Sequence, residues 1–357
     1  MDKITVSILI PCRNEEKFIE GAITSVLEFE DPDQIIQEIL LIDGMSIDNT
    51  KNTISKLAAT DDRIKLLENP HKHQAAALNI GIRQATGDYI MRLDAHAVYP
   101  ADYLILCQTT AQKSGADNIG GIVIPKISQN RYCASLVHAL TTHKFGVGDS
   151  GFRTSLQPGP TDTVPYGFFT KDIFERIGLF DERLVRAQDY EFNRRINAAG
   201  GTVWLNPEIQ VGYFNQPTLW RFLKKMFVQD APYNAYMWYL AHYTFAFRHA
   251  VTGIFTLGII FGCALSLVFW WVRWPFIALA GLYGLLAVIS GVQQAWRYKQ
   301  LLHVFLLPIS FFLFHFIHGC GLLVGIMRLL LGRAPVQQHS EPWPGAGRHQ
   351  AFHAEGI

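Results

Sequence analysis

The stretch "GDYIMRLDAHAVYP", residues 87–100, decides how this chain is read, because a strand pattern ends there in an aspartate and a histidine. Residues 88–94 alternate as a strand does, and Asp94 and His96 stand at its end. Ligands of an open α/β sheet bind beyond the carboxyl ends of its strands. A carboxylate and an imidazole at this spacing can both reach one divalent cation. We therefore predict a ligand site at this strand end.

Earlier apolar runs in the chain also read as strands, and helical patterns separate them. The expected strands are VSILIP (6–11), EILLID (38–43) and RIKLLEN (63–69), and the expected helices cover 18–27 and 73–85. Strands that alternate with helices predict a doubly wound, mostly parallel α/β sheet. Polar residues follow several of these strands, so we expect them to converge on one edge of the sheet: Pro11, Asn14 and Glu15, then Asp43, then Asp94 and His96.

Several other kinds of site are excluded by what the sequence lacks. Neither GxGxxG nor GxxxxGK[ST] occurs at the first strand-to-helix turn, so the usual dinucleotide and P-loop phosphate cradles are absent. The five cysteines form no CxxC pair and no zinc spacing, which fits free thiols in a reducing compartment. A formal net charge of +1 predicts no nucleic-acid partner. Side-chain carboxylates together with a metal would serve to hold a phosphorylated ligand.

The C-terminal third of the chain has a different composition. Residues 250–272, 274–292 and 301–327 contain no Asp, Glu, Lys or Arg, and each run is long enough for the ~30 Å hydrocarbon core of a bilayer. Aromatic residues cluster at the ends of these runs: Trp270, Trp271, Trp274, Trp296 and Tyr298. We predict about three transmembrane segments within 250–335. The alternative is a set of buried helices in a soluble protein.

The direction of the third segment stays open at this stage. Arg297 and Lys299 fit a return to the cytoplasm after two crossings. A third full crossing would place Arg328 and Arg333 outside, against the positive-inside tendency, so a break at Pro308 or a re-entrant segment is the alternative. The N-terminus shows no signal peptide, so we expect the part ahead of the first span to stay in the cytoplasm.

Four domains follow from these patterns. We expect a sheet domain over 1–215, an amphipathic or interfacial linker over 216–249, a transmembrane region over 250–335 and a tail over 336–357. In the linker, apolar and basic residues mix between 219 and 227, which is typical of a helix at a membrane surface. A helix of the protein core is the alternative.

Four stretches, in order, resemble the family 2 glycosyltransferases, the nucleotide-sugar enzymes of the GT-A fold. They are "SILIPCRNEE" (7–16), "LIDGMSIDNT" (41–50), "ALNIGIRQATGDYIMRLDAHAVYP" (77–100) and "GLFDERLVRAQDYEFNRRINAAGGTVW" (178–204). Together they cover roughly residues 4–210, and the apolar tail is similar to the membrane-tailed bacterial branch of the ExoA succinoglycan glucosyltransferase type. Three family positions differ: Ile42 and His96 each replace an aspartate, and Gln188 replaces a glutamate.

The resemblance implies a donor site at the strand ends. Asp94 matches the first acidic position of the family DXD element, which faces the sugar-nucleotide diphosphate and its Mn²⁺ or Mg²⁺, and His96 is a metal ligand or a diphosphate contact. Asp43 matches the aspartate that accepts a hydrogen bond from the uracil ring. The other nucleotide-sugar positions implied are Pro11, Arg13, Glu15 and Lys72. Capping of strand and helix ends, or a solvated surface lysine at Lys72, are the structural alternatives.

The resemblance also implies the catalytic residue. Asp189 matches the aspartate that takes the proton from the acceptor hydroxyl in an inverting transfer. Residues on the acceptor and diphosphate side would be Tyr166, Gly167, Gln188, Glu191 and Arg195. A structural ion pair is the alternative for Glu191 and Arg195, and a solvated helical face is the alternative for the whole group.

The function implied is transfer of a sugar, glucose from UDP-glucose, onto a lipid-linked (polyprenyl diphosphate) saccharide in bacterial polysaccharide biosynthesis. The enzyme would sit in the plasma membrane with its catalytic domain in the cytoplasm. The QxxRW element of processive synthases is absent, which favours one sugar per event. The rival functions are a polyprenyl-phosphate sugar synthase and an inactive membrane-anchored subunit that binds nucleotide sugars.

Overall fold

The computed structural model describes residues 4–126, 132–148, 151–154, 157–214 and 216–338, and the chain divides into two compact units. Unit 1 consists of Met1–Ile124, Gly151–Tyr213 and His339–Ile357, and unit 2 of Pro125–Ser150 and Phe214–Gln338. Unit 1 contains the sheet, and unit 2 contains the long apolar helices. Residues 339–357, most of the predicted tail, lie outside the described residues.

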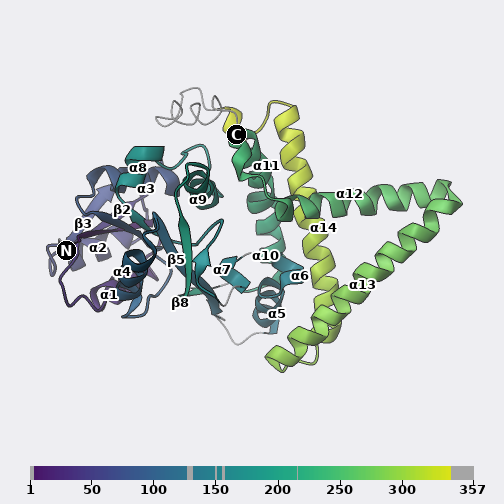
Figure 1. The fold of residues 1–357 in the computed structure, drawn as a ribbon, viewed down its shortest axis with the longest axis horizontal. Coiled ribbons are helices and arrows are strands. Elements are labelled where there is room, and N and C mark those ends of the chain that lie inside the picture. The colour runs from purple at the N-terminus through teal and green to yellow at the C-terminus, as the bar shows by residue number, and fades with distance from the viewer. Residues whose placement is uncertain (1–3, 127–131, 149–150, 155–156, 215, 339–357) are drawn as a thin grey trace. The chain divides into compact units, whose positions relative to one another are not determined.

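The sheet has eight strands in the order β3-β2-β1-β4-β7-β5-β8-β6 (Figure 1). Their bounds are β1 Val6–Cys12, β2 Ile36–Asp43, β3 Ile64–Glu68, β4 Tyr89–Arg92, β5 Asn118–Lys126, β6 Gly159–Pro160, β7 Phe168–Thr170 and β8 Val203–Phe214. β1 pairs in parallel with β2 and β4, and β2 pairs in parallel with β3. β7 is antiparallel to both β4 and β5, and β6 is antiparallel to β8. The predicted α/β sheet is confirmed, with its parallel part formed by the first four strands.

Helices cover both faces of this sheet, as Figure 1 shows for α3 and α8 above it and α1 and α4 below it. The helices of unit 1 are α1 Ile19–Leu27, α2 Thr50–Ala58, α3 Gln74–Gln84, α4 Tyr103–Ser114, α7 Gly151–Thr154, α8 Asp172–Ile177 and α9 Gln188–Ala198. In β1, Ile8 and Ile10 belong to the core formed with α1 and α4, whereas Leu9 belongs to the core formed with α3, α8 and α9. The alternation of a strand therefore supplies two separate cores.

A buried carboxylate holds the start of β4 in register. Glu38, on β2, is 1% exposed and accepts hydrogen bonds from Ser7 Oγ (2.8 Å) and from Thr86 N (2.7 Å) and Oγ1 (2.8 Å). Lys65 Nζ lies 2.8 Å from its other oxygen. Burial raises the pKa of Glu38, but the bonds from Lys65, Thr86 and Ser7 outweigh that effect and lower it to about 2. The turn leading into β4, and hence to Asp94, is held by this charge.

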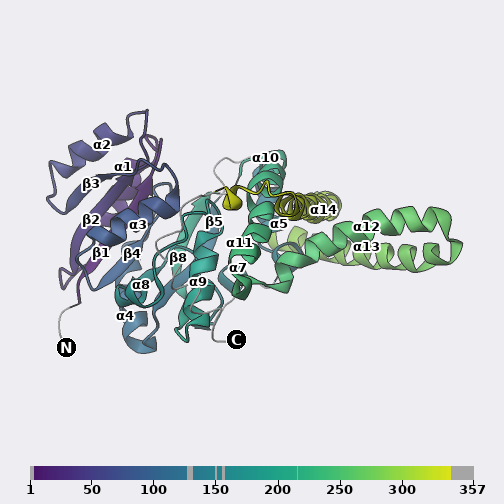
Figure 2. The same ribbon diagram turned by 90° about the horizontal axis from the view of Figure 1, so that it is seen from above.

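Apart from the last residues of β5 and β8 and the connecting loops, the described residues of unit 2 form helices. Its helices are α5 Tyr132–Thr141, α6 Lys144–Val147, α10 Leu219–Lys225, η1 Met226–Asp230, α11 Ala231–Leu240, η2 His242–Thr244, α12 Phe247–Val268, α13 Trp270–Tyr298, α14 His303–Leu330 and η3 Pro335–Gln337. Three stretches, Phe247–Val268, Trp270–Tyr298 and His303–Gln337, are long and apolar enough to cross a membrane, by length and composition. Pro308 lies inside α14 without interrupting it. α12 and α13 meet at a tip and form a helical hairpin whose two arms diverge in Figure 1 and overlap in the view of Figure 2.

Residues 125–150, expected within the sheet domain, group with unit 2 instead. The reason is the apolar face of α5, where Leu136 and Leu140 share a core with Phe222 of α10 and with Leu307 and Phe311 of α14. In the predicted interfacial linker, Phe222 therefore faces this core. Trp220, two residues earlier, is 71% exposed. α10 thus presents one apolar face to protein and one aromatic side chain outward.

Candidate active site

The parallel strands β1, β2 and β4 end at one edge of the sheet, and the predicted site residues follow them there. Asp43 is the last residue of β2, Glu15 follows β1, and Asp94 follows β4 by two residues. β1 lies between β2 and β4. Since neighbouring strands are ~4.8 Å apart, the ends of β2 and β4 are separated by about 10 Å, a distance that one nucleotide sugar can bridge.

The loops after β1 and β2 are held together by side-chain hydrogen bonds. Asn14 N donates to Ser46 Oγ (2.8 Å), and Glu15 N donates to Thr50 Oγ1 (2.8 Å). Asn14 and Met45 adopt left-handed backbone conformations, with φ of 56° and 59°. Such conformations cost energy in residues other than glycine and are kept only where the surroundings determine them. This part of the edge is therefore preformed.

Asp43 is a fully buried carboxylate with one oxygen to spare. Its Oδ2 accepts a hydrogen bond from Ser46 N (2.9 Å) and lies 3.6 Å from Lys51 Nζ. Its Oδ1 is buried and has no hydrogen-bond partner within the part of the chain that the structure describes. Buried polar atoms are normally paired, so this oxygen is able to accept a hydrogen bond that the described residues do not supply.

Arg92 joins two carboxylates that are far apart in sequence. It lies on β4 with a side chain only 4% exposed. Its Nη2 is 2.9 Å from Asp94 Oδ1, and its Nη1 is 2.8 Å from Asp189 Oδ2. The guanidinium also lies 5.7 Å from the centre of the Tyr166 ring, and Arg92 N donates to Gly167 O (2.9 Å). One cation thus brings together Asp94, Asp189, Tyr166 and Gly167, all of which were predicted as site residues.

A pair of glutamine side chains extends this arrangement. Gln74 is the first residue of α3, and its Nε2 donates to Asp94 Oδ1 (3.1 Å). Gln188 Nε2 donates in turn to Gln74 Oε1 (2.8 Å). Gln188 therefore contacts the site through an amide, although the corresponding family position carries a carboxylate. The exchange removes one negative charge beside Asp94 and Asp189.

Asp189 combines a helix N-terminus with a buried setting. It is the second residue of α9, a position where the helix dipole favours a carboxylate. Burial raises the pKa of Asp189, the nearby Arg92 lowers it and the charge of Asp94 raises it, and the net direction is upward. Its Oδ1 is buried without a hydrogen-bond partner in the described segments, while Oδ2 is held by Arg92. One oxygen is thus fixed and the other is left for a ligand proton.

His96 faces Glu15 across the edge, with 3.4 Å between His96 Nδ1 and Glu15 Oε1. The hydrogen bond to Glu15 raises the pKa of His96, and this effect outweighs the lowering by burial. A further contact joins two predicted donor-site loops, because Arg13 Nη1 donates to Lys72 O (3.5 Å). Pro11 lies within β1, opposite Ile42.

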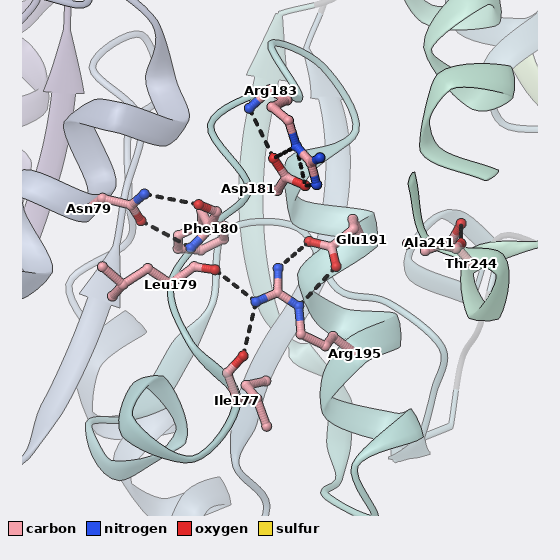
Figure 3. A network of polar contacts seen from close by, with 10 residues as sticks. All are labelled: Asn79, Ile177, Leu179, Phe180, Asp181, Arg183, Glu191, Arg195, Ala241 and Thr244. Carbon is pink, nitrogen blue, oxygen red and sulfur yellow. Dashed lines mark hydrogen bonds and ion pairs between the residues drawn. The ribbon is translucent and has the colours of Figure 1, made fainter. Parts of the chain in front are cut away.

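Glu191 and Arg195 lie behind the site, in the core. Both side chains are fully buried; Arg195 Nη2 is 2.5 Å from Glu191 Oε2, and Nη1 donates to the carbonyls of Ile177 (3.1 Å) and Leu179 (2.8 Å). Figure 3 shows this guanidinium closing the loop ahead of α9. The structure thus forms the structural ion pair, the alternative stated for these two residues. Buried as they are, neither side chain presents a surface to an acceptor.

The same loop is held from α3 as well. Asn79 Nδ2 donates to Phe180 O (2.9 Å), and Phe180 N donates to Asn79 Oδ1 (3.0 Å), as drawn in Figure 3. The loop ends at Ala187, whose φ of 65° is left-handed. The N-terminus of α9, and Asp189 with it, is therefore placed by contacts to two other elements.

Comparison with known proteins finds a family match over the first part of the chain. Residues 7–178 match the model described as "Glycosyl transferase family 2". The chain carries a family 2 glycosyltransferase domain. The match covers β1 to α8 and so includes the edge that carries Asp43 and Asp94.

Two curated relatives of this glycosyltransferase are 28% identical to it. One is the dolichyl N-acetyl-alpha-D-glucosaminyl phosphate 3-beta-D-2,3-diacetamido-2,3-dideoxy-beta-D-glucuronosyltransferase of Methanococcus voltae, aligned over 336 residues, 90% of this chain and 97% of that protein. The other is the succinoglycan biosynthesis protein ExoA of Rhizobium meliloti, aligned over 221 residues, 60% of this chain and 66% of that protein. The predicted enzyme class, a glycosyltransferase, is confirmed.

A solved structure confirms the GT-A type of fold. The mannosyltransferase PcManGT of Pyrobaculum calidifontis, determined in complex with GDP-Man and Mn²⁺, is similar with a TM-score of 0.56 at 16% identity. The similarity covers 92% of this chain and 87% of that one.

Two residues of the site, Arg92 and Gln74, were not predicted from the sequence. Arg92 had a local signal, because a charged residue stands inside the apolar run "YIMRL" of a strand that is buried on both faces. Such a residue must find a partner of opposite charge. Gln74 had no comparable signal, because a glutamine at the start of a helix is ordinary.

The glycosyltransferase site shows no preformed metal cage. Among the described residues, no three His, Cys, Asp or Glu side chains are grouped so that they could hold a metal ion. Asp94 Oδ1 is already shared by Arg92 and Gln74. A metal bound here would need oxygen ligands from a substrate.

We predict that Arg92→Met lowers kcat/KM of the glycosyltransferase by at least about tenfold at neutral pH, since base catalysis depends on a correctly held carboxylate. Arg92 lowers the pKa of Asp189, so its removal raises that pKa, and the acidic limb of the pH–rate profile moves to higher pH. Profiles of both proteins check this. Arg63→Met is the matched control, because Arg63 pairs with Asp61 (2.7 Å) in the turn before β3. An unmoved acidic limb in Arg92→Met would contradict the assignment.

Proposed function

We propose that this glycosyltransferase moves a sugar from a nucleoside diphosphate donor to a hydroxyl of a lipid-linked saccharide, with inversion at the anomeric carbon. The observation that carries this proposal is the geometry of Asp189. One of its oxygens is held 2.8 Å from Arg92, beside Asp94, and the other is buried without a hydrogen-bond partner in the described residues. A general base needs one oxygen that the protein orients and another that can accept the proton of the substrate, and Oδ1 has no competing hydrogen bond among the described residues.

In this mechanism, Asp189 accepts the proton of the acceptor hydroxyl while the hydroxyl oxygen attacks the anomeric carbon. The bond from that carbon to the diphosphate oxygen breaks, and the nucleoside diphosphate leaves as an anion. Burial raises the pKa of Asp189, which makes the carboxylate a stronger base. The charge of Arg92 lowers that pKa and so favours the ionised carboxylate. A single displacement requires no covalent nucleophile.

The donor would lie along the strand ends from β2 to β4. Asp43 Oδ1, buried and without a partner in the described residues, would accept the ring N–H of a uracil, which supports a UDP-sugar. Arg13 and Lys72, whose loops touch, would supply positive charge near the diphosphate. Glu15 would lie on the ribose side, in line with the family position it matches. UDP-glucose is the donor to test first.

A divalent metal, Mn²⁺ or Mg²⁺, fits the two residues Asp94 and His96 on chemical grounds. One carboxylate and one imidazole are few ligands, but such cations are commonly held by one or two protein groups together with substrate phosphates. An imidazole favours Mn²⁺ over Mg²⁺. When bound, the metal would neutralise charge on the departing diphosphate. PcManGT, which contains Mn²⁺, supports this proposal.

The acceptor is proposed from the Methanococcus relative and the apolar helices. The name of that relative gives a dolichyl-linked sugar phosphate as its acceptor, and its alignment extends over 90% of this chain. A saccharide already attached to a polyprenyl diphosphate is therefore favoured over a bare lipid phosphate. The ExoA relative, which is named for succinoglycan biosynthesis, supports a role in exopolysaccharide assembly at the bacterial plasma membrane, with the catalytic domain in the cytoplasm.

We predict that Asp189→Asn retains donor binding within a fewfold but lowers transfer by about 10²- to 10⁴-fold, the usual contribution of a general base. Titration with UDP-sugars and product analysis with lipid-linked saccharide check this in membranes. Asp172→Asn, an exposed aspartate that starts α8, is the matched control. A parent protein that binds donor but transfers nothing would favour the inactive subunit. Transfer to a bare lipid phosphate would favour the polyprenyl-phosphate sugar synthase.

Asp43→Asn should weaken the binding of the donor and leave the rate of transfer nearly unchanged. We expect at least about tenfold weaker UDP binding, because an amide replaces a charge-assisted acceptor, and little change in kcat at saturating donor. Ser46 N can still donate to the asparagine oxygen, so the loop is retained. Calorimetric titration with UDP checks the affinity. Unchanged UDP affinity would remove the base-binding role of Asp43.

For the metal, we predict that His96→Ala weakens Mn²⁺ binding by about tenfold in the presence of UDP, since one ligand is lost. Titration of Mn²⁺ followed by electron paramagnetic resonance measures this without reference to activity. His71→Ala, a change at an exposed histidine that precedes α3, is the control. Equal Mn²⁺ affinity in His96→Ala and the parent would leave His96 as a partner of Glu15 only.

A further inference from the structure

The three apolar helices of unit 2 differ in how much protein surrounds them. In α12 the buried residues are Thr252, Gly253 and Thr256, and in α13 they begin at Ala287. Residues 257–286, the outer part of the hairpin, contain no buried residue. In α14, by contrast, buried residues recur from His303 to Gly325. Only α14 is packed along most of its length.

The elements packed along α14 carry charge. Phe222 of α10 stacks near Phe314 with ring centres 5.5 Å apart. A Cβ on Gly325 would lie 2.8 Å from Pro232 Cα, so the backbones of α14 and α11 approach closely. Between these two contacts the chain contains Lys224, Lys225 and Asp230, and Lys225 Nζ lies 3.9 Å from Asp230 Oδ2.

The first half of α14 has polar neighbours as well. Phe145 of α6 lies 5.2 Å from Phe311, between ring centres, and Lys144 precedes it. Arg297, near the end of α13, donates to Thr142 O (3.4 Å). Basic residues therefore stand beside both halves of the helix.

A crossing of the bilayer by α14 would carry these charges with it. The helix is 28 residues, about 42 Å, so a transmembrane placement would put the region around Phe314 near the bilayer centre. Arg221, Lys224 and Lys225 of the adjoining α10 would then lie at the depth of the hydrocarbon, where charged side chains are strongly unfavourable. The packing of α14 therefore argues against a full crossing.

The exposed surface of α14 fits a membrane surface instead. Its exposed apolar side chains lie towards the two ends of one helical face: Phe305, Ile309 and Phe312 in the first half, and Met327 and Leu330 in the last turns. Between them the same face carries the half-buried Phe316, Cys320 and Leu323, so the apolar stripe continues along the helix. Basic residues stand at both ends: Arg297 and Lys299 before the helix, Arg328 in its last turn and Arg333 after it. An apolar stripe between basic ends is typical of a helix that lies in the headgroup region of anionic lipid.

α12 and α13 are long and apolar enough to cross the membrane. They are 22 and 29 residues long, about 33 and 43 Å, which matches a ~30 Å core with tilt. At their tip, Trp270, Trp271 and Trp274 are exposed next to Arg273. Figures 1 and 2 agree in showing α12 crosswise to α14, so the two helices cannot both follow the membrane normal.

We propose that α14 lies along the bilayer surface, with its apolar stripe on the acyl chains, and that the α12–α13 hairpin alone crosses the membrane. Two crossings place the start of α12 and the end of α14 on the same side. This inference does not depend on the proposed function. It replaces the expected third crossing by a surface helix and leaves Arg328 and Arg333 on the side that the positive-inside tendency favours.

Spin labels at Ile309→Cys and Met327→Cys test the proposal by measuring depth. Both residues are exposed, at 59% and 55%, and are 18 residues apart, about 27 Å along the helix. In the full chain, with native cysteines replaced by alanine, in vesicles of phosphatidylcholine and phosphatidylglycerol, oxygen and nickel accessibilities report depth. We expect the two labels at equal depth within a few Å. A difference of about 20 Å or more would overturn the proposal.

The matched control pair is Val251→Cys and Leu267→Cys on α12, exposed at 43% and 83% and about 24 Å apart. These labels should differ in depth by most of that distance.

The side of the membrane on which each residue lies gives an independent test. A membrane-impermeant maleimide should reach Trp270→Cys and Gln338→Cys from opposite faces of the membrane. Labelling of both from one face would contradict two crossings, whatever the enzyme transfers.

Discussion

The site of this glycosyltransferase depends on one buried cation, the guanidinium of Arg92. A charge that is 4% exposed must be paired, and Arg92 is paired twice, with Asp94 at 2.9 Å and Asp189 at 2.8 Å. The fork of an arginine fixes the directions of both bonds, which an ammonium group would not do. The carboxylates of Asp94 and Asp189 are therefore kept at one separation, although the two residues are 95 positions apart in the sequence.

A second arginine, the fully buried Arg195, helps to hold Asp189 within reach of Arg92. Arg195 closes the loop ahead of α9 through Glu191 and two carbonyl groups, and Asn79 holds the same loop from α3. Without these contacts the N-terminus of α9 would be free to move, and Asp189 with it. The start of α9, which carries Asp189, is thus held in place by the protein's own contacts.

The sequence predicted the parallel half of the sheet, and the sharing of one edge by several polar residues, for a physical reason. Buried parallel strands are continuous apolar runs, and polar residues such as Asp43 and Asp94 that end them must share an edge. Arg92 was missed because its partners come from distant segments, and local periodicity does not encode such pairing. Residues 125–150 were assigned to the wrong unit because an amphipathic helix such as α5 does not specify which apolar surface it covers. For α14, composition indicated a membrane helix, but its orientation depends on the charged neighbours packed beside it.

Ala187, with its left-handed φ of 65°, has one more consequence. An alanine in this conformation stores roughly 1 kcal/mol, which the contacts of the surrounding loop must offset. A glycine would release that energy and would also enlarge the set of directions in which α9 can leave the loop. Asp189, two residues further along the chain, would then be held less tightly. The methyl group of Ala187 thus narrows the directions open to the helix at the cost of local backbone strain.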